Sequence, residues 1–240
     1  MRKKEYGAHG FEELEKLYEE KPYQGQRPAA ARVVFLGRDA NYPQALDDDK
    51  YNFFKYILEY HNDGVAFWKN YNIHHPFLHP DYPCNKSNGK LFKDGIKYHK
   101  VFAKMGLDSR YAEYISFMEI LNKATCGNTG EDKDNWFYEN IEDAHIKMLE
   151  EVFLAPGERI VFIPKTVLRV DLLKVKKKTG RFGWLLDADR QSDLDEPCLI
   201  LKREGTRFYK CSHFSGAISN KHLGKIGEIV REFVDSASNS

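Results

Sequence analysis

The stretch RVVFLG, residues 32–37, predicts the centre of the fold. Its consecutive apolar residues are typical of a strand buried on both faces, and Gly37 opens a turn after it. Two further apolar runs predict strands, at residues 114–121 and at residues 159–163, where Pro164 closes the run. Residues 198–202 and 207–211 flank a Glu-Gly pair, which indicates a hairpin.

Apolar residues at helical spacing predict helices around these strands. The stripes are Phe11, Leu14 and Tyr18; Phe54, Ile57 and Leu58; Tyr98, Phe102 and Met105; Ile141, His145, Met148 and Val152; and Leu223, Ile226, Ile229, Val230 and Phe233. A short helix is expected over residues 166–174, whereas residues 67–90, which are rich in proline and histidine, are expected to be irregular.

Alternating apolar strands and helices favour an open α/β sheet with helices on both faces. We therefore expect a three-layer α/β/α fold with a central, mostly parallel sheet. With no repeat and no low-complexity linker, residues 1–240 are expected to form a single domain. Residues 1–30 are expected to contribute a helix and a loop, and residues 236–240 a frayed tail.

Composition limits the function. Hydrophobic residues make up 42% of the 240 residues, and 37 Lys and Arg face 36 Asp and Glu, so nucleic-acid binding requires a local basic surface. The polar start MRKKEYG, the absence of a long apolar run and four cysteines without CxxC spacing predict a cytoplasmic protein with reduced thiols. The chain has no GxxxxGKS/T, GxGxxG or GxSxG motif, which disfavours nucleoside triphosphatases, dinucleotide oxidoreductases and serine hydrolases.

Polar residues follow the predicted strands, where ligands bind in open α/β sheets. The first strand is followed by GRDANY at residues 37–42, the third by Lys165, and the last by SHFSG at residues 212–216. The second strand contains or precedes Ser116, Glu119, Asn122 and Lys123. A carboxylate, an amide and a histidine are therefore expected to meet at one edge of the sheet.

These segments resemble motifs of the uracil-DNA glycosylase superfamily. GRDANY at 37–42 is similar to its GQDPY motif, and FMEILNKAT at 117–125 resembles the second-strand segment of its mismatch-specific thymine/uracil branch. HFSG at 213–216 resembles the HPS or NPSG motif, which also precedes a C-terminal helix. The resemblance spans residues 32–234. It implies a glycosylase-like fold and a monofunctional DNA glycosylase that needs no metal or organic cofactor.

The resemblance also assigns roles that suit this chemistry. Asp39 would orient water and stabilise the sugar cation, and His213 would stabilise the departing base. The target base must be flipped out of the duplex to enter the site. Ser215 and Gly216 would approach the DNA backbone closely, and Ala217 and Ile218 would supply the wedge that fills the gap in the stack.

Two departures from the motifs indicate an unusual substrate. The superfamily's tyrosine, which blocks substituents at C5 of the pyrimidine, is replaced by Asn41, and Tyr42 comes one residue later. Glu119 aligns with the base-reading asparagine, and an ionised Glu only accepts hydrogen bonds, which suits the N4 amino group of cytosine. We therefore expect a glycosylase for a C5-modified cytosine, for example a bulky base of viral DNA.

Alternatives remain open. A different register makes Asn122 the base reader, which would restore a uracil or mismatch-specific glycosylase of base-excision repair. A protein of another class, a non-catalytic nucleic-acid-binding module, could share the fold. Each residue also has a structural interpretation: Asp39 could cap a turn, Asn41 could stabilise it, Glu119 could face solvent, and His213 could be buried and satisfied.

Lysines offer further candidate contacts. The run Lys174, Lys176, Lys177, Lys178 and Arg181 is either a solvated loop or a phosphate-contact surface. Lys165 is a further candidate for contact with the DNA backbone. No lysine is clearly placed as a Schiff-base nucleophile, and Lys165 is the one to test for that role. DNA is the expected partner, with neither a membrane nor an obligate protein partner. A metal site at His74, His75, His79 and Cys84 is set aside, because Pro76 and Pro80 interrupt any helix that would align them.

Overall fold

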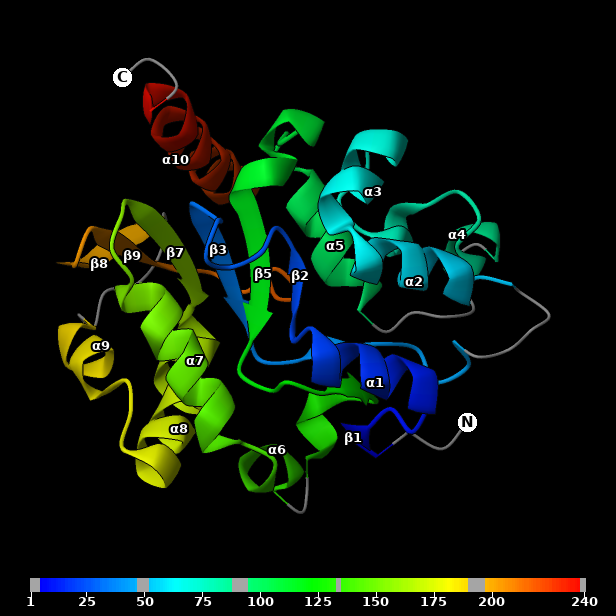
Figure 1. The fold of residues 1–240 in the computed structure, drawn as a ribbon, viewed down its shortest axis with the longest axis horizontal. Coiled ribbons are helices and arrows are strands. Elements are labelled where there is room, and N and C mark those ends of the chain that lie inside the picture. The colour runs from blue at the N-terminus through cyan, green and yellow to red at the C-terminus, as the bar shows by residue number, and fades with distance from the viewer. Residues whose placement is uncertain (1–4, 47–51, 88–94, 133–134, 190–196, 238–240) are drawn as a thin grey trace.

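The main sheet of the computed structural model has the strand order β2-β5-β3-β7-β9-β8 (Figure 1). The structure describes residues 5–46, 52–87, 95–132, 135–189 and 197–237. Neighbours among β5, β3, β7 and β9 pair in parallel, and the edge strands β2 and β8 are antiparallel, which confirms the mostly parallel sheet. The strands are β2 (Tyr23–Gly25), β3 (Val33–Gly37), β5 (Ile115–Glu119), β7 (Arg159–Pro164), β8 (Cys198–Arg203) and β9 (Thr206–Cys211).

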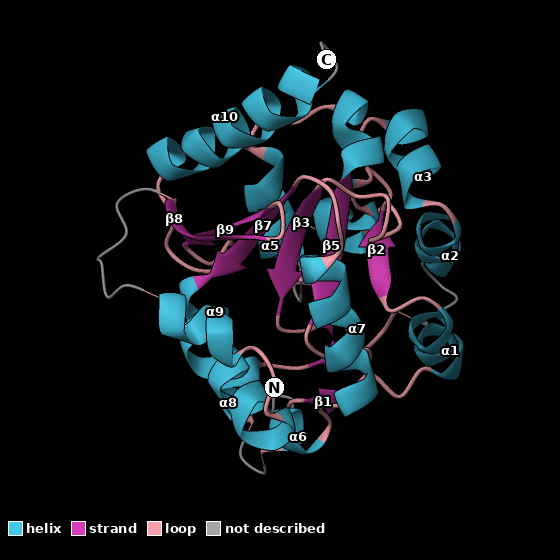
Figure 2. Cartoon of the chain, turned by 60° about the vertical axis from the view of Figure 1, so that its left-hand side comes forward, coloured by secondary structure: helices cyan, strands magenta, loops and turns pink. Residues whose placement is uncertain are grey.

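Side chains of β3 alternate between the two faces of the sheet, as the two-residue period of a strand requires. Val34 and Leu36 pack in a cluster with residues of α7 (Asp143–Leu154) and α8 (Leu172–Thr179). Val33 and Phe35 belong to a second cluster, with residues of α3 (Gly64–Tyr71), α5 (Ile96–Ala103) and α10 (Asn220–Ala237). Figure 2 shows helices on both sides of the sheet. The expected three-layer α/β/α fold is confirmed.

A smaller sheet braces the loops that follow β3 and β5. Its strands are β1 (Gly7–Ala8), β6 (Ala124–Cys126) and β4 (Ala40–Asn41), in that order. Ala40 pairs with Ala124, and Asn41 pairs with Thr125. Because these pairs fix the backbone directly after Asp39, the loop that carries this carboxyl group is held at both ends. Residues 1–30 thus contribute β1 and β2 as well as the expected helix, α1 (Glu12–Glu20).

Several elements differ from the expectations. Much of residues 67–87 is helical rather than irregular, because α3 reaches Tyr71, Pro76–Leu78 form a 3-10 turn and α4 (Pro83–Lys86) follows. Residues 88–90 lie outside the described part. The helix expected over residues 166–174 begins as a π-helical turn at Val167–Asp171 and continues as α8, so the lysine run lies on a helix. The remaining helices of the described ranges include α2 (Phe54–Asn62), α6 (Trp136–Glu139) and α9 (Gly183–Ala188).

The last described element is α10, which packs on the sheet through Leu223, Ile226 and Val230. Ser236 and Ala237, expected in a frayed tail, are its last residues, and residues 238–240 lie outside the described part. In the portion that the structure describes, none of the helices combines the length and the apolar character needed to cross a lipid bilayer.

Candidate active site

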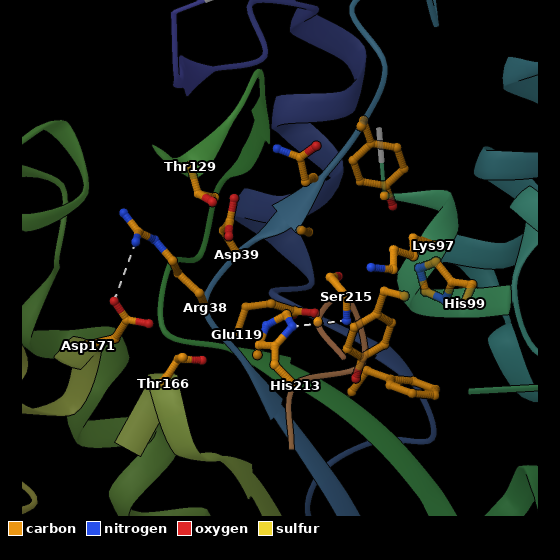
Figure 3. A pocket seen from close by; sticks show the side chains of 18 of the residues that line it. Arg38, Asp39, Lys97, His99, Glu119, Thr129, Thr166, Asp171, His213 and Ser215 are labelled. Atoms are coloured by element: carbon orange, nitrogen blue, oxygen red, sulfur yellow. Dashed lines mark hydrogen bonds and ion pairs between the residues drawn. The ribbon is translucent and has the colours of Figure 1, made fainter. Parts of the chain in front are cut away.

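A cavity of about 790 Å³ lies at the carboxyl ends of the parallel strands. Residues at or just after the ends of β3, β5 and β9 line it, together with Thr166, which follows β7. Figure 3 shows Asp39, Glu119, His213 and Ser215 among the side chains around it. The cavity brings together most of the predicted site residues: Asp39, Asn41, Tyr42, Glu119, His213, Ser215 and Gly216.

Asp39 is held by the strand that runs beside it. The Thr125 hydroxyl group, on β6, donates a hydrogen bond to Asp39 Oδ2. Burial raises the pKa of the Asp39 carboxyl group, while the Thr125 hydrogen bond and the positive charge of Arg38 oppose that rise. Burial has the larger effect, so the pKa of Asp39 stays above its ordinary value, and the Thr125 hydrogen bond and Arg38 limit the rise.

The Arg38 guanidinium group is fixed on the opposite side of this loop. Its Nη2 atom pairs with Asp132 Oδ2 at 2.8 Å, its Nη1 atom lies 3.5 Å from Asp171 Oδ1, and the group stacks 4.1 Å from the ring centroid of Phe137. Arg38 is therefore a positioned charge beside Asp39 rather than a mobile surface cation.

Glu119, the last residue of β5, is buried in the cavity wall. Glu119 is 8% exposed, and its Oε2 atom has no hydrogen-bond partner within the described ranges. Burial, with a contribution from the negative charge of Asp39, raises the pKa of Glu119 to about 8. The carboxyl group is therefore protonated at neutral pH. The side chain does not face solvent, and burial favours the protonated form rather than the ionised form expected from the sequence.

His213 is oriented by its own turn. The backbone N–H of Ser215 donates to His213 Nδ1 at 3.0 Å, and the N–H of Gly216 donates to the His213 carbonyl group at 2.9 Å. Burial, together with the nearby charge of Lys97, lowers the pKa of His213. The ring is therefore neutral at pH 7, and because Nδ1 accepts a hydrogen bond, Nε2 carries the proton. This arrangement presents a neutral N–H donor at the cavity.

Asn41 and Tyr42 form a wall anchored to their neighbours. Asn41 Nδ2 donates to the carbonyl group of Gly127 at 3.1 Å and lies 3.3 Å from Thr125 Oγ1. The Tyr42 hydroxyl group lies 2.9 Å from that of Tyr18, in the buried cluster next to α1. Asn41 thus does stabilise its loop, and the hydroxyl end of Tyr42 points to the core.

Asn122, the alternative base reader, is not brought to the cavity. Its Nδ2 atom donates to Glu142 Oε2 at 2.9 Å, and the residue is absent from the cavity lining as the structure describes it. The physical reason is that β5 ends at Glu119, and the chain then turns toward β6, which carries Asn122 away from the edge of the sheet.

The predicted wedge and lysine contacts also lie outside the described lining. Ile218 is half-buried and packs on the apolar cluster beneath α10, while Ala217 is exposed. Lys165 and the α8 residues Lys176 and Lys177 are likewise not lining residues, and Lys176 Nζ lies 3.7 Å from Asp187 Oδ1. The sequence spacing alone did not show that the Ile218 side chain packs against this apolar cluster.

Several lining residues come from segments that no sequence motif singled out for this role. Lys97, at the start of α5, is exposed and lines the cavity. His75 and His99 line it as a stacked pair, with ring centroids 3.5 Å apart. The adjacent His-His pair at 74–75 was a visible signal, but its partner His99 is distant in sequence. Among the described residues, no group of three or more His, Cys, Asp and Glu side chains could hold a metal ion.

The buried histidines should make stability depend on pH. His74 Nε2 lies 3.2 Å from His99 Nδ1, and burial lowers the pKa of His74 to about 3. The unfolded chain, with a His pKa of about 6.5, therefore binds more protons below that pH, and the free energy of unfolding falls as the pH falls. From pH 7.5 to pH 5.5, we expect His74 alone to remove about 1.4 kcal/mol.

Urea unfolding of the wild type and of His74→Gln at these two pH values measures this effect. The glutamine keeps hydrogen-bonding groups but does not titrate, so comparing the two proteins cancels the contribution of other groups. The wild type should lose more stability on acidification than the variant does. Equal losses would show that His74 is not held neutral by burial.

No model of a known protein family matches the chain, and no curated protein is significantly similar to it. Function is therefore inferred from the residues of the cavity and their surroundings.

Proposed function

We propose that this protein is a DNA glycosylase that hydrolyses the N-glycosidic bond of a flipped-out base and leaves an abasic site. The observation that carries the proposal is the shared cavity of Asp39, Glu119 and His213 at the carboxyl edge of the sheet. Asp39 would stabilise the cation that develops at C1′ and take a proton from the attacking water. His213 Nε2–H would donate to the base oxygen on which negative charge develops.

The size and wall of the cavity support a substituted base. At about 790 Å³, the space is within the range that binds drug-sized ligands and exceeds what an unsubstituted pyrimidine fills. By the resemblance, Asn41 would take the place of the superfamily tyrosine, and the Tyr42 hydroxyl group points to Tyr18. We therefore favour a C5-modified cytosine, of the kind found in viral DNA, as the substrate.

Uracil is the second candidate substrate, because a protonated Glu119 can form hydrogen bonds with it. A neutral carboxyl group offers one donor and one acceptor. It can thus pair with N3 and N4 of cytosine or with N3 and O4 of uracil, whereas a carboxylate would repel O4. Glu119 could therefore read the base in a uracil or mismatch-specific repair glycosylase, and Asn122 would not be needed for that role.

Release of free bases from defined oligonucleotides tests the proposal. The panel contains cytosine, 5-methylcytosine, a cytosine with a bulkier C5 substituent and uracil, in single and double strands, with enzyme in excess. Mass spectrometry should detect the free substituted base and an abasic strand. Intact oligonucleotides throughout would overturn the proposal, and DNA binding without release would identify a non-catalytic binding module.

Lys97 is the exposed cation best placed to contact a DNA phosphate beside the flipped nucleotide. Lys97→Ala should weaken binding to all sequences and reduce the slope of log affinity against log salt by about 1. Lys177→Ala is a matched control, because this exposed lysine lies outside the described lining. An unchanged slope for Lys97→Ala would exclude the contact, and a reduced slope for Lys177→Ala would extend the DNA footprint over α8.

A further inference from the structure

Three carboxyl groups line the cavity, and two of them, Asp39 and Glu119, have opposite surroundings. The third, Asp171, lies 3.5 Å from Arg38 Nη1. Asp39 accepts a hydrogen bond from Thr125 and has Arg38 as its neighbour in the chain. Glu119 is more than nine-tenths buried, and its Oε2 atom has no partner among the residues that the structure describes. Thr125 and Arg38 thus stabilise a negative charge on Asp39, while nothing described stabilises one on Glu119.

Such an asymmetric pair is how one site maintains an acid and a base at the same pH. Like charges in one cavity disfavour double ionisation, so the group with hydrogen-bond donors keeps the charge and the group without them keeps the proton. Asp39 is therefore the base of the pair, and Glu119 is the acid. His213 does not compete for the acid role, because its neutral ring has only the Nε2 hydrogen to donate.

We propose that Glu119 is the general acid that protonates N3 of a cytosine-type base as its glycosidic bond breaks. This inference rests on the proposed glycosylase function and names both a catalytic residue and a substrate class. A cytosine that leaves without protonation must carry a full negative charge, which its single carbonyl group disperses less well than the two carbonyl groups of uracil do. Protonation at N3 removes that cost.

The step balances in protons and electrons. The Glu119 proton moves to N3, the C1′–N1 bond breaks and its electron pair stays on N1, so the base leaves as a neutral tautomer. Water adds to the resulting C1′ cation and gives its proton to Asp39. Exchange with solvent then returns a proton to Glu119 and removes one from Asp39, so that the net reaction is hydrolysis.

The contacts and charge states of the groups around Glu119 favour Glu119 as the source of this proton. On the backbone side, His145 Nε2–H donates to the Glu119 carbonyl oxygen at 2.8 Å and does not reach the carboxyl group in that interaction. Burial holds the tyrosines near it neutral by raising their pKa values. The groups that influence the charge of Glu119 or contact its backbone are Asp39, Tyr18, Tyr42, Tyr60, Tyr98 and His145. The other titratable and charged side chains that line the same cavity are Arg38, His75, Lys97, His99, Asp171 and His213.

Single-turnover release of the C5-substituted cytosine by the wild type and by Glu119→Gln tests the inference. Glutamine keeps a donor and an acceptor at the same place but has no acidic proton. The rate should fall by about 10²-fold or more in the variant, the usual contribution of a positioned acid, while DNA affinity stays close to that of the wild type. Retained DNA binding also shows that the variant is folded.

A pH profile of the wild type gives a second readout that needs no variant. Because the pKa of Glu119 is about 8, the release rate should decline above that pH as the acid is lost. Equal rates for Glu119→Gln and the wild type, or a wild-type rate that rises steadily through pH 8 to 9, would overturn the acid role while leaving the glycosylase proposal standing. If the wild type releases no base at any pH, the glycosylase proposal itself fails.

Discussion

Replacing Asp39 with asparagine should lower the rate of base release by about 10³-fold, the largest effect that we expect from a single substitution. Asparagine preserves the shape of the side chain but carries no charge to offset the sugar cation and cannot take a proton from water. Its amide can still approach Thr125, so the loop between β3 and β4 should keep its conformation. Single-turnover kinetics with the released base detected by mass spectrometry measures the effect.

A matched control separates this loss from a general effect of removing a negative charge. Asp187→Asn makes the same chemical change on α9, where the side chain lies 3.7 Å from Lys176 and outside the described lining of the cavity. It should leave base release within a few-fold of the wild type. Base release by Asp39→Asn at the wild-type rate would remove Asp39 from the mechanism and return it to the role of a turn residue.

His213→Ala should lower the rate by about 10²-fold to 10³-fold, since loss of one positioned donor to a developing oxyanion has an effect of this size. The alanine removes the Nε2–H donor and also the Nδ1 acceptor of the Ser215 N–H. His213→Asn tests which loss matters, because its amide can restore a donor. Partial recovery of the rate in His213→Asn is the expected result.

Thr166→Ala serves as the control for His213→Ala, because Thr166 lines the same cavity and has no role in the proposed chemistry. It should keep the wild-type rate. If His213→Ala retained full activity while Thr166→Ala lost it, the donor to the departing base would have to come from another wall of the cavity.

The fold and the centre of the site follow largely from local sequence pattern. A run such as residues 33–36 can be buried on both faces only in a sheet covered by helices, and parallel strands place their carboxyl ends on one edge. Asp39, Glu119 and His213 meet because each follows or ends such a strand. Their meeting therefore needed no knowledge of long-range packing.

The features that the sequence did not predict depend on tertiary contacts. The strands β1, β4 and β6 are two or three residues long, too short to show an alternating pattern. Lys97 and His99 reach the cavity only because α5 packs beside the sheet. Ile218, expected as a wedge, packs against the cluster beneath α10, and a surface loop and a core contact look alike in sequence.

The charge state of Glu119 also depends on tertiary contacts, and it decides which chemistry the residue can perform. An isolated Glu is ionised at neutral pH, which led to the expectation of a pure acceptor. Burial at the end of β5, beside Asp39, reverses that state. The residue lies at the edge of the sheet where the sequence predicts it, but the role that we propose for it changes from reading an amino group to supplying a proton.

The most direct test of the account is a crystal structure of the wild-type protein bound to a duplex that carries a 2′-fluoro analogue of the C5-substituted cytidine. The fluorine disfavours the cation at C1′ and so slows cleavage of the bond. The account predicts an extruded nucleoside in the cavity, with C1′ nearest Asp39 and the base edge against Glu119 and His213. A bound duplex whose target base stays stacked, with the cavity empty, would contradict it.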